Sequence, residues 1–242
     1  MLAHIVFVTP LRRLLVASQG SVLRSIDRGK QWHRVGLLRD VFSFVSTTSG
    51  AILAATNQGI FRSVDDGETW SERSLGLSEL IGARPNESFR IRALAAGTDG
   101  TIYAATQRGD VFGSTDLGDR WRPFAPPIRG LESLLVTKTG DLLAAGHSGL
   151  FRWERSDGVW RPIAMILGRQ QPQVNVVVQH PGGVLLAGTE DQGVLASFDD
   201  GTTWEAASGG LTARAVYSLA IDALGTVFAG TSQGVFTSTN VR

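Results

Sequence analysis

The chain contains no cysteine among its 242 residues, so it has no disulfide framework and no thiolate chemistry. It also lacks any run of 18 apolar residues, the length that a membrane-spanning helix would need. Residues 1–10 do not combine a charged segment with a long apolar run, so we do not expect a signal peptide there. No stretch shows sustained helical periodicity. The lack of helical periodicity favours an all-β protein. The absence of cysteine leaves the compartment of the protein undecided.

Charge is nearly balanced, with 23 basic and 22 acidic residues and a formal net charge of +1. Global electrostatics therefore predict neither a nucleic-acid partner nor membrane insertion. Only Lys30 and Lys138 among the basic residues are lysines. The dominance of arginine suits bidentate contacts with anions, but a GC-rich coding bias explains it equally well.

One pattern, Ser-x-Asp-x-Gly-x-x-Trp, recurs along the chain. Its four full copies are Ser25–Trp32, Ser63–Trp70, Ser114–Trp121 and Ser197–Trp204. A shortened copy spans Ser156–Trp160, and the chain stops inside a sixth copy at Ser238-Thr239-Asn240. Self-similarity at a fixed period of about 20–50 residues is typical of solenoids and propellers.

A glycine that opens the third strand of each repeat gives a second measure of the period. These glycines, spaced by 39 to 50 residues, are Gly20, Gly59, Gly109, Gly149, Gly193 and Gly234. Four strands joined by tight turns need about 40–50 residues, the length of a propeller blade. Short apolar runs separated by Asp-Gly or Gly-Gly turns predict hairpins. We therefore predict a single six-bladed antiparallel β-propeller domain over residues 1–242, with blades at about 3–36, 41–75, 91–125, 131–163, 174–207 and 216–240.

The sixth blade lacks an outer strand in this prediction, because only Val241 and Arg242 follow its partial motif. Either the sequence is a segment of a longer exported protein, which would place it outside the cytoplasm, or the blade is natively three-stranded. In both cases the third strand, 234–237, becomes an edge that could pair with another chain.

The repeated pattern predicts a turn between the third and fourth strands. The aspartate can accept backbone N–H groups of the turn, the glycine can take a positive φ, and the tryptophan can bury its ring against the hairpin. We expect a structural role for Asp27, Trp32, Asp65, Trp70, Asp116, Trp121, Asp157, Trp160, Asp199 and Trp204. A calcium or sugar site on Asp65-Asp66 or Asp199-Asp200 is disfavoured, because an isolated pair supplies too few ligands for calcium.

These residues resemble the Asp-box, or BNR, motif, most fully at Ser63–Trp70 and Ser197–Trp204. The motif occurs in propellers of sialidases, sortilin-type receptors, xyloglucan-cleaving glycosidases and photosystem II assembly factors. The resemblance covers essentially the whole chain and implies a propeller fold, but it does not imply an activity. In sialidases the boxes lie on the face away from the active site, which implies a structural role here.

Catalysis finds little support in the sequence. The sialidase resemblance would require an early Arg-Ile-Pro signature, which is absent, and a tyrosine nucleophile, whereas Tyr103 and Tyr217 are expected in the core. A glycosidase needs two carboxylates about 5–10 Å apart. Glu190-Asp191 is the best candidate, but neither Glu132 nor Glu79 is evidently its partner.

We expect no metal and no cofactor. The four histidines His4, His33, His147 and His180 lack the spacing of a metal site, and no glycine-rich phosphate loop is present.

Arginine precedes or opens every first strand after the first blade. In a propeller these interblade connections share a face with the turns between second and third strands, and that face commonly binds ligands. The residues are Arg39, Arg90, Arg92, Arg129, Arg169 and Arg214. Guanidinium groups on one face would favour a carboxylate, a phosphate or an acidic protein segment, although polar loops in an arginine-rich chain would look the same.

The sequence therefore predicts a non-enzymatic binding or scaffold module for a protein or an anionic ligand. The alternative is a glycoside hydrolase, sialidase- or glucanase-like, or a carbohydrate-binding propeller. The long connection between Trp70 and Ile91 could carry function or be a neutral insertion.

Overall fold

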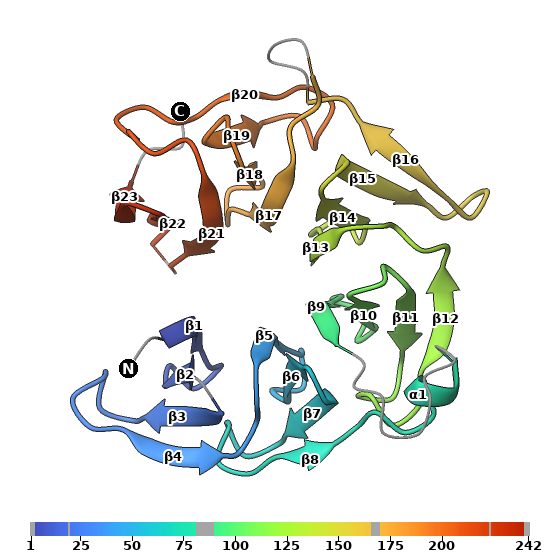
Figure 1. Cartoon of the computed structure of the whole chain (residues 1–242), viewed down its shortest axis with the longest axis vertical. Helices are drawn as coiled ribbons and strands as arrows, with labels where there is room; N and C mark the ends of the chain where they lie inside the picture. The colour runs from blue at the N-terminus through green and yellow to red at the C-terminus, as the bar shows by residue number, and fades with distance from the viewer. Residues whose placement is uncertain (1–2, 19, 81–89, 166–169, 223, 240–242) are drawn as a thin grey trace. The chain divides into compact units, whose positions relative to one another are not determined.

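The computed structural model describes residues 3–18, 20–80, 90–165, 170–222 and 224–239. Within these ranges it is an all-β, six-bladed propeller of antiparallel sheets whose last blade has three strands, which confirms the predicted fold class (Figure 1). The chain divides into two compact units, Met1–Pro127 and Ile128–Arg242, each holding three blades. Its organisation as a single domain stays a prediction.

The first unit holds blades 1 to 3 and a single helical turn, α1 (Leu77–Leu80). Their strands are β1 (Ala3–Val8), β2 (Leu14–Ser18), β3 (Ser21–Ser25) and β4 (His33–Gly36); β5 (Val41–Ser46), β6 (Ile52–Thr56), β7 (Gly59–Ser63) and β8 (Ser71–Glu72); β9 (Ile91–Ala96), β10 (Ile102–Thr106), β11 (Val111–Ser114) and β12 (Arg122–Ala125).

The second unit holds blades 4 to 6. Their strands are β13 (Leu131–Val136), β14 (Leu142–Gly146), β15 (Gly149–Glu154) and β16 (Val159–Ile163); β17 (Val174–Gln179), β18 (Leu185–Thr189), β19 (Val194–Ser197) and β20 (Glu205–Ala206); β21 (Val216–Ile221), β22 (Val227–Thr231) and β23 (Gly234–Ser238). In every blade the strands pair in sequence order.

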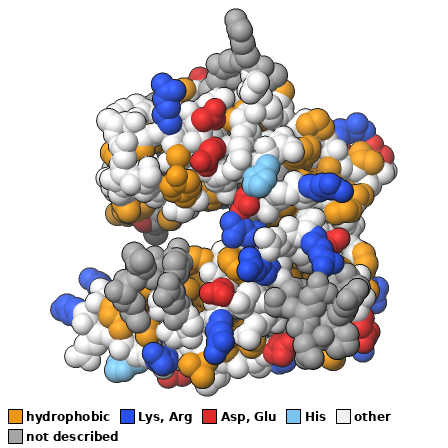
Figure 2. Space-filling model, in the orientation of Figure 1, with side chains coloured by type: hydrophobic (Ala, Val, Ile, Leu, Met, Phe, Trp, Pro, Cys, Tyr) orange, Lys and Arg blue, Asp and Glu red, His pale blue; other side chains and the backbone are white. Residues whose placement is uncertain are grey.

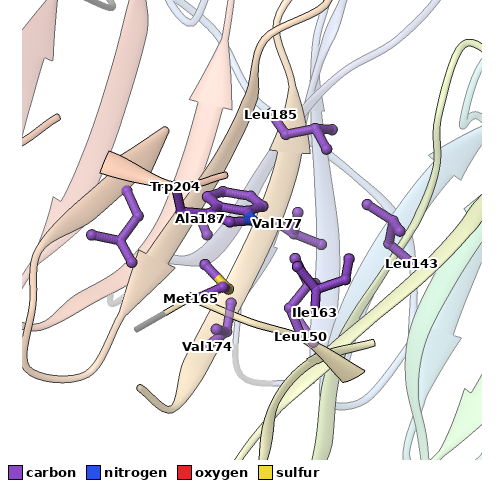
Figure 3. Packing of buried hydrophobic residues seen from close by; sticks show 11 residues of the cluster. Leu143, Leu150, Ile163, Met165, Val174, Val177, Leu185, Ala187 and Trp204 are labelled. Atoms are coloured by element: carbon purple, nitrogen blue, oxygen red, sulfur yellow. The ribbon is translucent and has the colours of Figure 1, made fainter. Parts of the chain in front are cut away.

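The cores of both units lie between neighbouring blades. The second strands β6, β10, β14 and β18 are buried at every position. β6 and β18 belong to the middle blade of their unit, which has a neighbouring blade on each face. Figure 3 shows one such core, which includes Leu143 and Leu150 of blade 4, Val177 and Leu185 of blade 5, and Met165 from the connection between the two blades. Equivalent clusters join blades 1 and 2, blades 2 and 3, and blades 5 and 6.

The four full copies of the repeated pattern form the same turn. The serine hydroxyl donates to the aspartate and accepts the glycine N–H, as in Ser63 Oγ to Asp65 Oδ1 at 2.7 Å and Gly67 N to Ser63 Oγ at 2.8 Å. The aspartate Oδ1 also accepts a backbone N–H four residues on, here from Thr69 at 2.9 Å. The residue before each glycine adopts a positive φ as well, which the sequence did not indicate; these residues are Arg28, Asp66, Leu117 and Asp200.

Blade 4 departs from this arrangement. Its turn is closed by a Gly158 N–H bond to the Glu154 carbonyl at 3.0 Å, and Trp160 lies inside β16, opposite Trp153. Asp157 forms an ion pair with Arg161. The shortened motif therefore makes a different, tighter hairpin, because it lacks the residues that the longer turn needs.

The tryptophan of the repeated pattern is buried only where a preceding blade covers it. Trp121 is 5% exposed and donates its Nε1–H to Arg73 of blade 2, and Trp204 is 8% exposed beside Ile163 of blade 4. Trp32 is 37% exposed, so the expectation that its ring is buried is wrong. Blade 1 has no preceding blade within its unit.

Arginines clamp three of these turns to the blade before. Arg24 of β3 donates to the Asp66 carbonyl at 2.9 Å and to Glu68 at 2.6 Å in blade 2. Arg62 and Arg152 reach the Leu117 and Asp200 carbonyls in the same way. The acids beside these turns are thus neutralised by arginine, and no group of three or more acidic, histidine or cysteine residues that could hold a metal occurs in the described ranges.

Removing the clamp of blade 1 should weaken the fold. Asp66 is buried, and its carboxylate lies 3.5 Å from both Arg24 and Arg13. Arg24→Gln leaves it with the Arg13 contact alone and also removes the ion pair with Glu68, so we expect the free energy of unfolding to fall by about 3 kcal/mol. Urea denaturation measures this change. The matched control, Arg34→Gln at an exposed position, should change the free energy by less than about 0.5 kcal/mol. Equal effects of the two substitutions would contradict the clamp.

Asp199 should titrate well below an ordinary aspartate. Hydrogen bonds from the Thr203 hydroxyl and backbone N–H lower its pKa from 3.8 to about 2. The folded pKa lies below the unfolded one, so its stabilising effect is complete above pH 4 and is lost as the pH falls towards 2. Carboxyl NMR titration should show Thr203→Val raising this pKa towards 3.8. Thr202→Val is the control, since that hydroxyl bonds the Asp199 carbonyl and not the carboxylate.

Candidate functional site

The loops before the first strands adjoin the turns between second and third strands. Three hydrogen bonds show this within single blades: Gln107 N to Arg90 O at 2.9 Å, His147 N to Gly130 O at 3.0 Å, and Glu190 N to Gln173 O at 3.1 Å. In blade 2 the Asn57 amide donates to the Asp40 carboxylate instead, at 2.6 Å. We call the surface formed by these loops and turns in each unit its loop face.

A β-bulge opens the first strand of every blade at this face. The strand register shifts at the second residue, so that residue has no partner on the neighbouring strand. A bulge of this kind re-aims a side chain and is common beside functional sites. The bulge residues are His4, Phe42, Arg92, Glu132, Asn175 and Tyr217.

These bulge residues differ from blade to blade, whereas their neighbours repeat. The preceding residues, Val41, Ile91, Leu131, Val174 and Val216, are all aliphatic and buried. Repetition therefore serves packing, and the variable bulge position is free to differ in chemistry. Among the bulge residues, only Arg92 is predicted from the sequence as a binding residue, and Glu132 is considered as a carboxylate partner of Glu190. The sequence does contain a feature that could have indicated the bulge residues. The residue directly after the first aliphatic residue of each first strand differs from blade to blade, whereas the aliphatic residue repeats.

Tyr217 corrects an expectation. The sequence placed Tyr103 and Tyr217 in the core, and Tyr103 is indeed 3% exposed, with its ring edge-on to Phe124. Tyr217 is 53% exposed, because it occupies the bulge of β21 rather than a regular strand position.

The loop face of the first unit is basic. Arg92 places its guanidinium 5.4 Å from the centroid of the Phe42 ring, a cation–π contact between blades 2 and 3. Arg39 and Arg90 are exposed on the adjoining loops. The two acids here are engaged, since Asp40 accepts from Asn57 and Asp110 accepts from the Thr106 hydroxyl at 2.9 Å. This combination can bind an anionic group.

The loop face of the second unit is mixed in charge. Arg129 and Arg214 are exposed there, and Arg169 lies outside the described residues. Glu132 lies 3.6 Å from His147. The Asn175 side-chain amide donates a hydrogen bond of 2.9 Å to the Glu190 carboxylate and another of 3.1 Å to the Val216 carbonyl. Glu79 lies in the other unit, on α1.

Figure 2 shows one face of the molecule, on which Lys and Arg side chains are interspersed with acidic, apolar and uncharged ones. Among the described residues no helix is long and apolar enough to cross a membrane.

Comparison with known proteins supports the fold and no closer relationship. No family model matches the chain, and no curated protein matches it either. The chain resembles the extracellular domain of BT4673 from B. thetaiotaomicron, a protein described as a hybrid two component system, with a TM-score of 0.74 and 15% identity. It resembles the GH74 xyloglucanase of Xanthomonas campestris with a TM-score of 0.73 and 19% identity. YCF48 bound to D1 peptide matches with a TM-score of 0.69 and 17% identity.

Coverage differs among these matches. The chain is covered over 98%, 95% and 93% of its length, respectively. It spans only 32% of the first protein and 43% of the xyloglucanase, against 73% of YCF48. At these identities the likeness shows a six-bladed propeller similar to those of BNR-type proteins and YCF48, a fold that serves sensing domains, an enzyme and a peptide-binding protein.

Close backbone contact holds the loop face of blade 4 together. A Cβ at Gly146 would lie 2.2 Å from the Gly130 carbonyl oxygen, so no side chain fits there without moving the loop. Gly146→Ala should lower the free energy of unfolding by about 1–3 kcal/mol and shift the NMR signals of His147. Gly113→Ala is the control, because its Cβ would meet only the Phe124 side chain at 3.5 Å. An unchanged His147 environment in Gly146→Ala would contradict this role.

Proposed function

We propose that this chain is a non-enzymatic binding module whose loop face in the first unit takes a protein segment or ligand bearing negative charge. The observation that carries the proposal is the set Arg39, Arg90 and Arg92 on adjacent blades, beside acids that are already hydrogen-bonded. Guanidinium groups bind carboxylates and phosphates in a bidentate manner, and Phe42 supplies an apolar surface next to them. Arg129, Arg169 and Arg214 are proposed to give the loop face of the second unit a separate preference for negative charge.

The repeated turns are proposed to be Asp-boxes with a structural role. Their hydrogen bonds close on themselves and on the preceding blade, which leaves the loop face for binding. Some of the similar propellers are extracellular domains, and we propose an extracytoplasmic location for this chain by analogy. Cell fractionation tests the location.

Three arginine substitutions on the loop face should weaken binding of an acidic peptide. The variant carries Arg39→Gln, Arg90→Gln and Arg92→Gln, and the probe is a fluorescein-labelled hexaglutamate peptide. We expect at least a tenfold rise in Kd by fluorescence anisotropy, with a strong dependence on salt.

The matched control removes the same charge elsewhere in the same unit. Arg34, Arg120 and Arg122 are exposed and lie away from the loop face, so their joint replacement by Gln should leave Kd nearly unchanged. Equal losses in the two variants would show unspecific charge attraction and would overturn the assignment of the site.

The second candidate function is recognition or hydrolysis of carbohydrate in the second unit. It is favoured by the orientation of Glu190 by Asn175, next to the exposed Asp191. Turnover of sialosides or β-glucans that disappears in Glu190→Gln would establish this function in place of the binding module.

A further inference from the structure

Two turns of blade 1 project side by side at the end opposite to the loop face. One joins β1 to β2 over residues 9–13, and the other joins β3 to β4 over residues 25–31. The pairing of Leu14 with Ser25 sets these turns next to one another. We call the five residues Leu11, Arg12, Ile26, Arg28 and Lys30 the blade 1 tip; all five are exposed.

Arg12 occupies a backbone position that the other blades fill with glycine. Its φ is 58°, in the left-handed region, and its amide donates to Thr9 O as Gly50 donates to Thr47 O in blade 2. The equivalent residues, all with positive φ, are Gly50, Gly100, Gly140, Gly183 and Gly225. A side chain in this conformation costs stability, and such strain is typical of functional positions. Folding therefore gives no reason for an arginine at this turn.

Among the turns between third and fourth strands that lie in the described residues, the one in blade 1 is the only basic one. Arg28 and Lys30 stand where blade 2 has Asp66 and Glu68, and where blade 5 has Asp200 and Thr202. Asp27 between them is engaged, because its carboxylate accepts from the Ser25 hydroxyl at 2.8 Å and the Gln31 N–H at 2.9 Å. With Arg12 this gives three cations and one hydrogen-bonded carboxylate. The net charge of +1 for the whole chain hides this local excess.

Aliphatic side chains stand beside these cations. Leu11 is 65% exposed and Ile26 is 62% exposed. The equivalent of Ile26 in blade 2, Val64, is 74% exposed although a preceding blade covers its turn, so this exposure belongs to the turn itself. Val64 stands among Asp65, Asp66 and Glu68, whereas Ile26 stands among cations.

We propose that the blade 1 tip docks the protein on an anionic phospholipid surface. Leu11 and Ile26 enter the boundary between headgroups and acyl chains, and Arg12, Arg28 and Lys30 bind the lipid phosphates. A nucleic acid or another polyanion would use the cations but would leave the two aliphatic side chains without a contact. This binding is peripheral, and it is independent of the loop face.

Vesicle co-sedimentation tests the proposal, with phosphatidylcholine vesicles that contain or lack about 30% phosphatidylserine. The wild-type chain should bind the anionic vesicles and release them as salt is raised. The double variant Arg28→Asp with Lys30→Glu gives this turn the residues of the blade 2 turn, where Asp66 adopts the same positive φ as Arg28. It should weaken binding about tenfold or more.

Arg12→Gly separates function from folding. The substitution restores the glycine of the other blades, so we expect Tm to rise by about 2–4 °C while vesicle binding falls. Leu11→Ser with Ile26→Ser should also weaken binding. Val64→Ser, at the matched tip in an acidic turn, and the loop-face arginine variant should bind vesicles as the wild type does.

Three results would overturn the proposal. They are equal binding to neutral and anionic vesicles, wild-type binding by Arg28→Asp with Lys30→Glu, and undiminished binding by Leu11→Ser with Ile26→Ser. The last result, together with tight binding of heparin or an oligonucleotide, would identify the tip as a general polyanion site.

Discussion

Packing of one blade against the next is the constraint on which the structure depends. A four-stranded sheet with apolar residues on both faces cannot cover them itself, so each blade needs a neighbour. The second strands of the middle blades show this most clearly: Ile52–Thr56 and Leu185–Thr189 are buried at every position. Most other features of the chain serve to fix the blades at the spacing that this packing requires.

The repeated turn and the arginine clamp act together in this task. Serine and aspartate close the turn, which presents the carbonyl of the residue before its glycine to the previous blade. Arg24, Arg62 and Arg152 bind that carbonyl and an acid beside it. Blade 3 has Gly113 in place of the clamp, and the blade after it has the shortened turn. Blades 1, 2 and 4 each have a clamp arginine, and the blade that follows each of them in the sequence has a full turn for that arginine to bind.

Departures from the repeat are concentrated at the two ends of the strands. The bulge residues Phe42, Arg92, Asn175 and Tyr217 vary at the loop face, while the aliphatic residues before them do not. At the opposite end, blade 1 alone combines Arg12, Arg28 and Lys30. Packing between blades explains the residues that repeat from blade to blade. It does not explain an exposed residue that differs from its equivalents, and we infer a binding role for such residues.

The sequence by itself determined the number of blades, the strand order and the turns, since each depends on local patterns that repeat. The hydrogen bonds of Gly67 and Asp65 that close their turn join residues only four positions apart in the sequence, so the local pattern is enough to predict the turn. Only the tertiary structure decided which side chains are exposed, because burial depends on the neighbouring blade. Trp121 and Trp32 occupy the same motif, but only Trp121 has a blade before it in its unit. The bulge that turns Tyr217 outward likewise arises from strand register, which pairing between strands decides and composition does not.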